Sequence, residues 1–424
     1  MNYDEAIKFL FDCVPNYQKS GKTAIRKGLK NIKILSNRFN NPQNTFNSIH
    51  VGGTNGKGTT SVAIANFCLS LDLKIGLFTS PHVYDFRERI QVNGKNIEKS
   101  FLINFISNNI EFFKENDFSF FEINTIMAFE YFRYSKVDLA VIEVGLGGKL
   151  DSTNIIKPII SLVTNVGYDH QNILGSKIDD ISREKAGIIK PNSLFIKGEE
   201  QNNIDHIFKD ECIKRNSTFL STSRNVKVKS LSKTFSKRKI RIEYNKNQTF
   251  ELNLENPANY YLMNIKVAIF AFIKTAEYYK KVPLLSKHNK NKFKVYGRWN
   301  IISKNPYIIS DGCHNIDSFK TIISEINLSS FKNIYFIIGG LKEKKWNEIC
   351  EILPKEYNYI LIQTSNKRTI RTSDLKRYFI ENKLNYNIKI DINDALKYCK
   401  KIASKNDLIF IGGSLFIMSD YNEE

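Results

Sequence analysis

The sequence predicts an α/β protein with a larger N-terminal domain, built on a parallel sheet with a flanking β region, and a smaller doubly wound C-terminal domain. Apolar runs typical of strands alternate with helical patterns over residues 48–190, and this alternation returns from residue 307 onward. Such alternation favours parallel sheets covered by helices. Between the two regions, residues 287–295 are basic and poor in large apolar side chains. We therefore expect one domain over residues 1–293 and another over residues 294–424.

Composition excludes several classes of protein. The net charge is +20, from 63 Lys and Arg against 43 Asp and Glu, but the basic residues are spread along a chain rich in residues of A/T-rich codons. We therefore expect no nucleic-acid partner. No run approaches the ~18 apolar residues of a membrane helix, and the N-terminus lacks a signal-peptide pattern, so we expect a cytoplasmic protein without a membrane partner. The six cysteines form no C-x-x-C pair, which argues against disulfides and a zinc site.

The first 45 residues predict one or two amphipathic helices. Residues 21–35 place apolar side chains at helical spacing, namely Ile25, Leu29, Ile32 and Leu35. This N-terminal segment is short compared with the rest of the chain.

The segment SIHVGGTNGKGTTS, residues 48–61, predicts a phosphate-binding loop. A short apolar run leads into a glycine-rich turn, and a helical pattern follows from Thr59 to Leu71. Glycines let backbone N–H groups converge on an anion, the helix N-terminus adds partial positive charge, and Lys57 adds a full one. The spacing is shorter than in a Walker A motif, because the first glycine of the turn is Gly53 and position 51 is Val. The N-terminal sheet is therefore expected to be of P-loop type.

Three polar side chains follow predicted strands of the same sheet. Ser80 comes after residues 74–79, Glu143 lies at the end of residues 137–144, and His170 follows residues 158–163. The carboxyl ends of parallel strands meet at one edge, where ligands bind. A buried carboxylate needs a cation, and Mg²⁺ prefers oxygen ligands with retained water. We expect a magnesium site beside the phosphate loop.

Further along the chain, residues 178–190 predict a short helix that ends at Gly187, and residues alone give its Lys185 no role beyond a solvated charge. Short β-like runs between Leu194 and Leu254 are expected to extend or edge the sheet. Residues 259–278 predict a helix.

A second α/β pattern follows the basic linker. Its expected strands are residues 307–310, 334–338, 359–363 and 407–411, and each ends in a polar or glycine-rich turn. This predicts a Rossmann-like domain.

Taken together, the motifs resemble the folylpolyglutamate synthase and dihydrofolate synthase family of the Mur ligase superfamily, in its bacterial bifunctional form. The matching segments are HVGGTNGKGTT (50–60), TSPHVYDFRERIQVNG (79–94), FFEINT (120–125), IEVGLGGKLDSTN (142–154), TNVGYDHQNILG (164–175), EKAGIIK (184–190), GRW (297–299) and DGCHN (311–315). The resemblance implies an ATP-binding, Mur-ligase-like central domain followed by a glutamate-ligase domain. It implies ATP and Mg²⁺ as cofactors, and dihydropteroate, reduced folates and L-glutamate as partners of a monomeric enzyme.

The resemblance also implies roles for individual residues. The nucleotide would be bound by Thr54, Asn55, Gly56, Lys57, Gly58, Thr59, Asn264, Arg298 and Asp311. The metal ligands would be Ser80, Glu143, His170 and Lys185 carried as a carbamate, and His314 would join Lys57, Glu143, His170 and Lys185 as a catalytic residue. The pteroate side would be met by Gly28, Ser119, Phe120, Leu150, Asp151 and Ser152.

Some positions depart from the family pattern. Lys149 stands where Arg is usual, and Tyr261 where Gln is common. In the second domain, Glu343-Lys344-Lys345 replaces a typical Asp-Lys-Asp, and Lys367-Arg368 replaces a typical Pro-Arg.

Three alternatives stand beside this interpretation. A peptidoglycan Mur ligase shares the loop, but only about 50 residues precede it, too few for the N-terminal domain of such ligases. A basic nucleic-acid-binding protein would bind RNA or DNA with a steep salt dependence. A degenerate subunit would bind ATP without turnover. Within the favoured interpretation the sequence does not choose between dihydrofolate synthesis and folate polyglutamylation, and we expect both.

Overall fold

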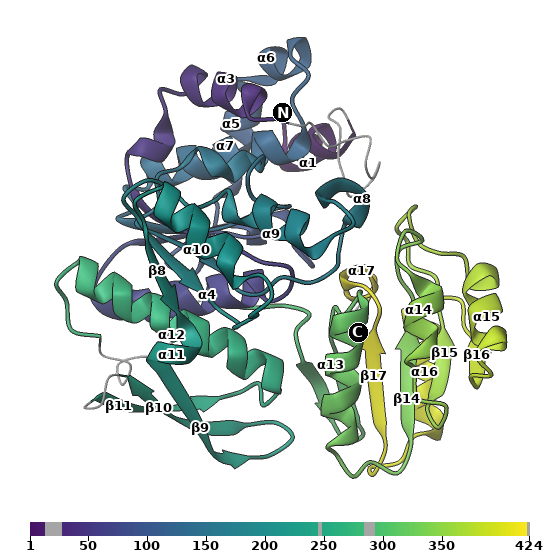
Figure 1. Cartoon of the computed structure of the whole chain (residues 1–424). Coiled ribbons are helices and arrows are strands. Elements are labelled where there is room, and N and C mark those ends of the chain that lie inside the picture. The colour runs from purple at the N-terminus through teal and green to yellow at the C-terminus, as the bar shows by residue number, and fades with distance from the viewer. Residues whose placement is uncertain (13–27, 245–247, 284–292, 422–424) are drawn as a thin grey trace. The chain divides into compact units, whose positions relative to one another are not determined.

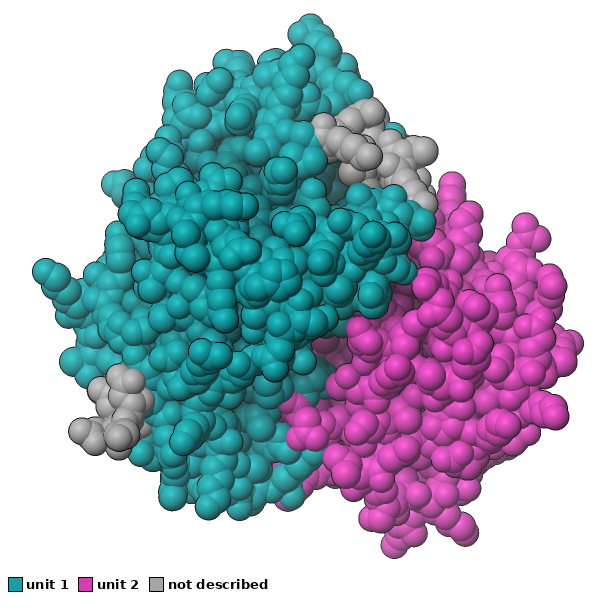
Figure 2. All heavy atoms as spheres, in the orientation of Figure 1, with its two compact units in different colours: residues 1–233, 238–254, 260–295 teal, residues 234–237, 255–259, 296–424 magenta. Residues whose placement is uncertain are grey.

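The computed structural model describes residues 1–12, 28–244, 248–283 and 293–421 (Figure 1). It divides into two compact units, coloured separately in Figure 2. Unit 1 comprises residues 1–233, 238–254 and 260–295, and unit 2 comprises residues 234–237, 255–259 and 296–424. Two short segments, residues 234–237 and 255–259, therefore belong to unit 2, although the residues on either side of residues 234–237 belong to unit 1.

Within the described residues, unit 1 centres on one eight-stranded sheet with the order β4-β3-β2-β5-β1-β6-β7-β8. The strands from β2 to β8 in this order pair in parallel, while β3 and β4 form an antiparallel edge. This confirms the parallel α/β prediction. The strands are β1 (Asn47–Gly52), β2 (Ile75–Phe78), β3 (Ile90–Val92), β4 (Lys95–Asn96), β5 (Leu139–Glu143), β6 (Ile160–Val163), β7 (Leu194–Lys197) and β8 (Thr218–Ser221).

Helices cover both faces of this sheet because its central strands are apolar on both sides. In β5, Leu139 and Val141 join one core cluster, whereas Ala140 and Ile142 join the other. The first cluster packs against α4 (Lys57–Cys68) and α12 (Asn259–Tyr278). The second packs against α1 (Tyr3–Asp12), α3 (Lys30–Arg38), α5 (Lys99–Ser107), α6 (Ile110–Glu115) and α7 (Phe120–Tyr134). A third cluster lies under α9 (Ile178–Ala186) and α10 (Asp205–Lys214).

Short helical elements of unit 1 connect several of these strands and helices. They are η2 (Pro42–Asn44), η3 (Leu69–Leu71), η4 (Phe86–Arg89), η5 (Ser152–Ile155), α8 (Gln171–Leu174) and α11 (Thr222–Asn225).

The flanking β region was predicted only in part. Strands β7 and β8 do extend the main sheet, but β9 (Val226–Lys233), β10 (Arg238–Tyr244) and β11 (Gln248–Leu254) form a separate antiparallel sheet. Burial alternates strictly along β10, and its Ile240 and Ile242 join the core cluster beneath α12. A strand buried on one face packs as a layer on a helix, so the expectation that these runs edge the main sheet is wrong for β9 to β11.

Two sequence expectations fall partly outside the described residues. The helix expected over residues 21–35 is described only from residue 28, and α3 begins at Lys30 with Ile32 and Leu35 buried. Most of the linker expected over residues 287–295 also lies outside the described ranges.

Unit 2 contains a six-stranded sheet among its described residues, ordered β12-β13-β17-β14-β15-β16. All neighbours pair in parallel except the antiparallel pair β12–β13. The predicted strands are present, and β12 and β16 were not anticipated. The elements are β12 (Asn300–Lys304), β13 (Tyr307–Ser310), α13 (Ile316–Asn327), β14 (Ile334–Ile338), α14 (Trp346–Glu351), β15 (Asn358–Leu361), α15 (Thr372–Glu381), β16 (Tyr386–Ile388), α16 (Ile392–Ile402), β17 (Leu408–Gly412) and α17 (Leu415–Ser419).

Two further expectations concern the whole chain. No helix in the described ranges is long and apolar enough to cross a membrane. The described cysteines are buried and free, namely Cys68, Cys212, Cys313, Cys350 and Cys399.

Candidate active site

The glycine-rich loop joins β1 to α4, as the sequence predicts. Gly56 caps α4 with a left-handed backbone (φ +82°), and a Cβ at this position would lie 2.2 Å from Oδ1 of Asn264. Gly53 has φ +143°, and a Cβ there would lie 1.9 Å from Oγ1 of Thr164. Only glycine meets both demands, because it lacks the Cβ that would clash and adopts positive φ freely. Asn264, predicted to contact the nucleotide, therefore packs directly against the loop.

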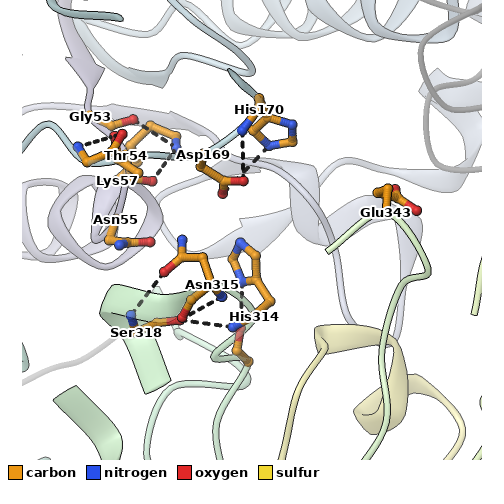
Figure 3. Close-up of polar contacts among 12 residues, drawn as sticks. Gly53, Thr54, Asn55, Lys57, Asp169, His170, His314, Asn315, Ser318 and Glu343 are labelled. Atoms are coloured by element: carbon orange, nitrogen blue, oxygen red, sulfur yellow. Dashed lines mark hydrogen bonds and ion pairs between the residues drawn. The ribbon is translucent and has the colours of Figure 1, made fainter. Parts of the chain in front are cut away.

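Two lysine ammonium groups meet at this loop. Lys57 donates to the backbone oxygens of Gly53 and Thr54, each over 3.1 Å (Figure 3). Lys185 reaches the same Gly53 oxygen over 2.9 Å and is only 3% exposed. Burial, and then the positive charge of Lys57, lower the pKa of Lys185 to about 7. The expectation from residues alone that Lys185 is solvated is wrong, because α9 turns this side chain towards the loop.

The phosphate loop is fastened to the segment that follows β6. The backbone N–H of Thr54 donates to the Asn165 oxygen, and that of Asn55 to the Asn165 side chain, both over 3.0 Å. The Gly167 N–H donates to Thr54 Oγ1 over 2.9 Å, and Thr164 Oγ1 donates to the Asn55 oxygen over 2.7 Å. Residues 164–167 therefore hold Thr54 and Asn55 of the loop through backbone and side-chain hydrogen bonds.

The N-terminus of α4 carries an unsatisfied hydroxyl. Thr59 is 2% exposed, and its Oγ1 has no hydrogen-bond partner among the described residues. A buried hydroxyl without a partner costs free energy, so a polar ligand at the start of α4 would satisfy it. This is the position at which the sequence predicts a phosphate or a metal ion.

Glu143 lies at the end of β5 with its carboxylate buried (4% exposed). Its Oε2 accepts a hydrogen bond from the Ser80 N–H over 2.8 Å, and it lies 3.5 Å from the position of a Cβ on Gly58. Ser80, Glu143 and the start of α4 therefore form one edge of the sheet. The solvent-facing alternative for Glu143 is excluded by its burial.

A buried arginine supports this edge and was not anticipated. Arg89 is 2% exposed, donates to Nδ1 of His82 over 2.7 Å, and lies over the Phe120 ring at 5.2 Å. Burial lowers its pKa to about 10, opposed by the carboxylates of Glu143 and Glu88. A positive charge near Glu143 reduces the cost of burying that carboxylate. The signal in the sequence that could have identified Arg89 is the charged pair Glu88-Arg89 within the motif of residues 79–94.

His170 begins α8 with a left-handed backbone (φ +51°). Its N–H donates to Oδ1 of Asp169 over 2.9 Å, and its Nε2 lies 3.8 Å from Oδ2 of the same residue (Figure 3). It follows the segment that holds Thr54. No three His, Cys, Asp or Glu side chains gather at metal-binding distance within the described residues. The predicted ligand set instead combines a serine hydroxyl, one carboxylate, His170 and Lys185, and a Mg²⁺ ion that keeps several waters suits such a sparse set.

Residues predicted for the pteroate side fall into two groups. Leu150 is 43% exposed, and Gly28 has φ +112° with no heavy atom within 4 Å of the position a Cβ would take. Ser119 and Phe120 are buried, and Ser119 forms a capping box with Glu122 at the start of α7. Ser119 and Phe120 therefore belong to the interior beneath the loops and not to the exposed surface.

Asp151 is the centre of its own loop. Its Oδ2 accepts from the Leu146 N–H over 2.7 Å, and its Oδ1 accepts from Oγ1 of Thr153 over 2.5 Å. His50, which is fully buried in β1, extends this row of hydrogen bonds, because its Nε2 lies 2.8 Å from Thr153 Oγ1. Because the threonine proton goes to Asp151, the histidine must donate from Nε2. Asp151 thus closes a loop in which Leu150 is exposed and Ser152 is half-buried.

In unit 2, the predicted nucleotide residues lie around the end of β13. Asp311 is 5% exposed, and its Oδ2 accepts from the Trp299 N–H over 2.8 Å. Arg298 donates to the Gly297 oxygen over 2.9 Å, and its guanidinium crowds Gly312. His314 Nδ1 donates to the Gly312 oxygen over 2.8 Å. The structure thus gathers all three within unit 2.

Comparisons with known proteins point to one family. The Mur ligase middle domain family matches residues 51–272, and the Mur ligase glutamate ligase domain family matches residues 297–415. The chain is 30% identical to the dihydrofolate synthase/folylpolyglutamate synthase of Buchnera aphidicola subsp. Schizaphis graminum, over 98% of this chain and 96% of that protein. It is 29% identical to the Bacillus subtilis protein of the same name, over 94% and 95%.

Solved structures agree. The folylpolyglutamate synthase of Thermotoga maritima superposes with a TM-score of 0.81 at 27% identity, over 98% of this chain and 95% of that chain. A folylpolyglutamate synthase complex with AMPPCP and folate superposes with a TM-score of 0.83 at 28% identity, over 99% and 98%.

Proposed function

Because the chain belongs to the dihydrofolate synthase/folylpolyglutamate synthase family of Mur ligases, we propose that this one enzyme carries both activities. It is an ATP-dependent ligase that joins L-glutamate to a pteroate or folate carboxylate. The two acceptors of the proposal are dihydropteroate and a reduced folate. Two relatives that cover nearly the whole chain carry the double name, which supports this choice.

One observation carries the catalytic proposal: Lys57 and Lys185 converge on the Gly53 oxygen beside the start of α4. The Lys57 ammonium, the N-terminal end of a twelve-residue helix and the buried Thr59 hydroxyl make this an anion-attracting place. We assign residues 53–59 to the ATP phosphates on this basis.

The proposed reaction has two steps. An acceptor carboxylate oxygen attacks the γ-phosphorus of ATP, the bond between that phosphorus and the bridging oxygen breaks, and ADP leaves. The amine of L-glutamate attacks the carbonyl carbon of the resulting acyl phosphate, the bond between that carbon and the phosphate oxygen breaks, and an amide, inorganic phosphate and a proton are released. In this scheme Lys57 neutralises charge on the transferred phosphoryl group, which is largely positioning and electrostatic work.

Metal binding is assigned to the edge formed by Ser80 and Glu143, together with His170. Magnesium bound there would supply charge neutralisation to the phosphates. The buried carboxylate of Glu143 and the unpartnered Thr59 hydroxyl fit a hard, partly hydrated cation.

Lys185 is proposed to act as a carbamate, formed when its unprotonated amine attacks carbon dioxide and loses a proton. Its burial against the Lys57 ammonium supports this, because the change replaces a repulsive cation pair by an attractive pair. A high-resolution map from crystals grown with bicarbonate would show either the carbamate or a bare ammonium.

The remaining assignments follow the family pattern. Gly28 and the loop of Leu150 and Ser152 would receive the pteroate, with Ser119, Phe120 and Asp151 beneath. Asn264 would contact the nucleotide from α12, while Arg298, Asp311 and His314 of unit 2 would complete nucleotide binding and catalysis. The division into an ATP-binding region and a glutamate-ligase region, and a cytosolic monomer, also remain predictions.

The alternatives receive less support. Relatives matching most of the chain are named for folate synthesis, so similarity to peptidoglycan ligases is at the level of the superfamily. The degenerate-subunit alternative rested on the divergent second-domain motifs. Glu343, which stands where the family typically has Asp, forms an ion pair with Arg368, the arginine that matches the typical Pro-Arg, so this departure leaves Arg368 an acidic partner.

The test is ATP-dependent ADP release by the purified protein with Mg²⁺ and L-glutamate, with dihydropteroate or tetrahydrofolate as acceptor. We expect turnover with both. Turnover with one acceptor alone would reject the bifunctional proposal, and nucleotide binding without turnover on either would favour the degenerate subunit.

A further inference from the structure

We propose that Gln201 and Lys197 form a brace that positions the ATP-phosphate loop from behind, acting through Val166. Neither residue belongs to the motifs that carry the family resemblance. The inference rests on the proposed role of residues 53–59 in binding ATP.

Gln201 holds the backbone of Val166 on both sides. Its Oε1 accepts from the Val166 N–H over 2.8 Å, and its Nε2 donates to the Val166 oxygen over 2.7 Å. A side-chain amide that satisfies both polar groups of one residue fixes that peptide segment much as a neighbouring strand would. Val166 is only 4% exposed, so these two backbone groups have little access to water in its place.

Lys197 fixes the amide in turn. It ends β7, is fully buried, and donates to Oε1 of Gln201 over 3.1 Å and to the Glu199 oxygen over 2.5 Å. Its ammonium lies 3.7 Å from Asp205 and 5.6 Å from the centre of the Phe208 ring. Because Oε1 accepts from this cation, the amide orientation is defined: Nε2 must face the Val166 oxygen.

The other side of the braced segment carries the phosphate loop. Val166 is flanked by Asn165, which accepts from the backbone N–H groups of Thr54 and Asn55, and by Gly167, whose N–H donates to the Thr54 hydroxyl. A continuous path of hydrogen bonds therefore runs from Lys197 through Gln201 and residues 165–167 to the loop.

A glycine-rich loop needs such support. Glycine loses more conformational freedom on ordering than other residues, so a loop with Gly53 and Gly56 would, without support, present its N–H groups to phosphate in many arrangements. Rigid neighbours reduce the entropy lost when ATP binds. The brace should therefore act on nucleotide affinity more than on the acceptor.

The test compares Gln201→Ala with the matched control Glu200→Gln. Glu200 is the exposed neighbour, and its contacts are to Ser223 and Arg224. Binding of the non-hydrolysable analogue AMPPCP is measured directly, beside KM and kcat for ATP and the acceptor. We expect Gln201→Ala to weaken AMPPCP binding and raise the KM for ATP about 10-fold or more, with kcat at saturating ATP and the acceptor KM within about 3-fold of wild type. Glu200→Gln should match wild type.

Two further variants separate positioning from mere stability. Gln201→Glu keeps an acceptor for the Val166 N–H and for Lys197 but loses the donor to the Val166 oxygen, so its nucleotide affinity should fall between those of wild type and Gln201→Ala. Lys197→Met keeps the contact with Phe208, and combined with Gln201→Ala it should weaken AMPPCP binding no further than Gln201→Ala alone.

The outcomes are distinct. A lower melting temperature of Gln201→Ala with unchanged AMPPCP affinity would overturn the brace while leaving the proposed function intact. Additive losses in the double variant would overturn the pathway through Lys197. Wild-type protein that binds no AMPPCP would overturn the proposed function and this inference together.

Discussion

Lys57 and Lys185 donate to the same atom, the backbone oxygen of Gly53, over 3.1 and 2.9 Å. Residues 128 positions apart in sequence thus place two basic side chains on one carbonyl, beside the N-terminus of α4. Burying Lys185 next to the Lys57 ammonium costs folding free energy, a trade-off common at catalytic sites.

Lys57→Met removes one of these charges. We expect at least about a 100-fold loss of turnover, the magnitude typical of losing a group that stabilises transition-state charge. Unfolding stability should be unchanged or higher, since the mutation relieves repulsion on Lys185. ADP release and thermal unfolding measure the two effects, with the exposed Lys95→Met as control. Turnover within 3-fold of wild type would remove Lys57 from the site.

Gly56→Ala tests the geometry of the loop. An alanine at this position would have to adopt φ near +82°, and its Cβ would lie 2.2 Å from Oδ1 of Asn264. We expect a loss of stability of about 1–3 kcal/mol and loss of ATP binding. The stability control is Gly58→Ala in the first turn of α4, whose Cβ meets only ordinary contacts near Glu143. A Gly56→Ala protein as stable as wild type would contradict the strained backbone described for this position.

These tests show which features the sequence could predict. The strand–loop–helix around Gly56, the parallel sheet and the edge shared by Ser80 and Glu143 follow from local patterns and from the rule that parallel strands end together. Lys185 could not be found in this way, because its helix is charged and its burial depends on how α9 packs against a distant loop.

The separate sheet of β9 to β11 shows the same limit. Short β-like runs predicted its strands, but their partners are set by packing on α12, whose buried positions include Phe270. Arg89 and Gln201 also act through contacts far apart in sequence, with Phe120 and Val166. Periodicity predicts elements, whereas such side-chain partners depend on tertiary structure.

His50 gives a pH dependence of stability. Burial, with a smaller effect from the nearby Lys190, lowers the pKa of His50 from 6.5 to about 3. Between these values the unfolded chain binds a proton that the folded chain does not, so stability rises with pH up to about 6.5 and is lost on acidification. From pH 7 to pH 5 we expect this group to cost about 2 kcal/mol.

Urea unfolding at pH 5 and pH 7 measures this effect in wild type and in His50→Gln. The variant keeps a donor for Thr153 but no longer titrates, so its difference between the two pH values should be smaller by about that amount. An equal pH dependence in both proteins would show that His50 does not carry it.

The ion pair between Arg368 and Glu343 tests whether the divergent residue Glu343 stabilises unit 2 through an arginine that matches the family pattern. The Arg368 side chain is 8% exposed and that of Glu343 is 31% exposed. Removing either partner leaves a partly buried charge behind, at a cost of about 1–3 kcal/mol after allowance for solvent screening. We expect Glu343→Ala and Arg368→Ala each to show such a loss in urea unfolding.

The double variant should lose less than the sum of the two by about 1 kcal/mol, the coupling typical of residues in contact. Strictly additive losses would mean that the ion pair contributes no coupling free energy. Coupled losses would show that Glu343, in place of the typical Asp, stabilises unit 2 through Arg368.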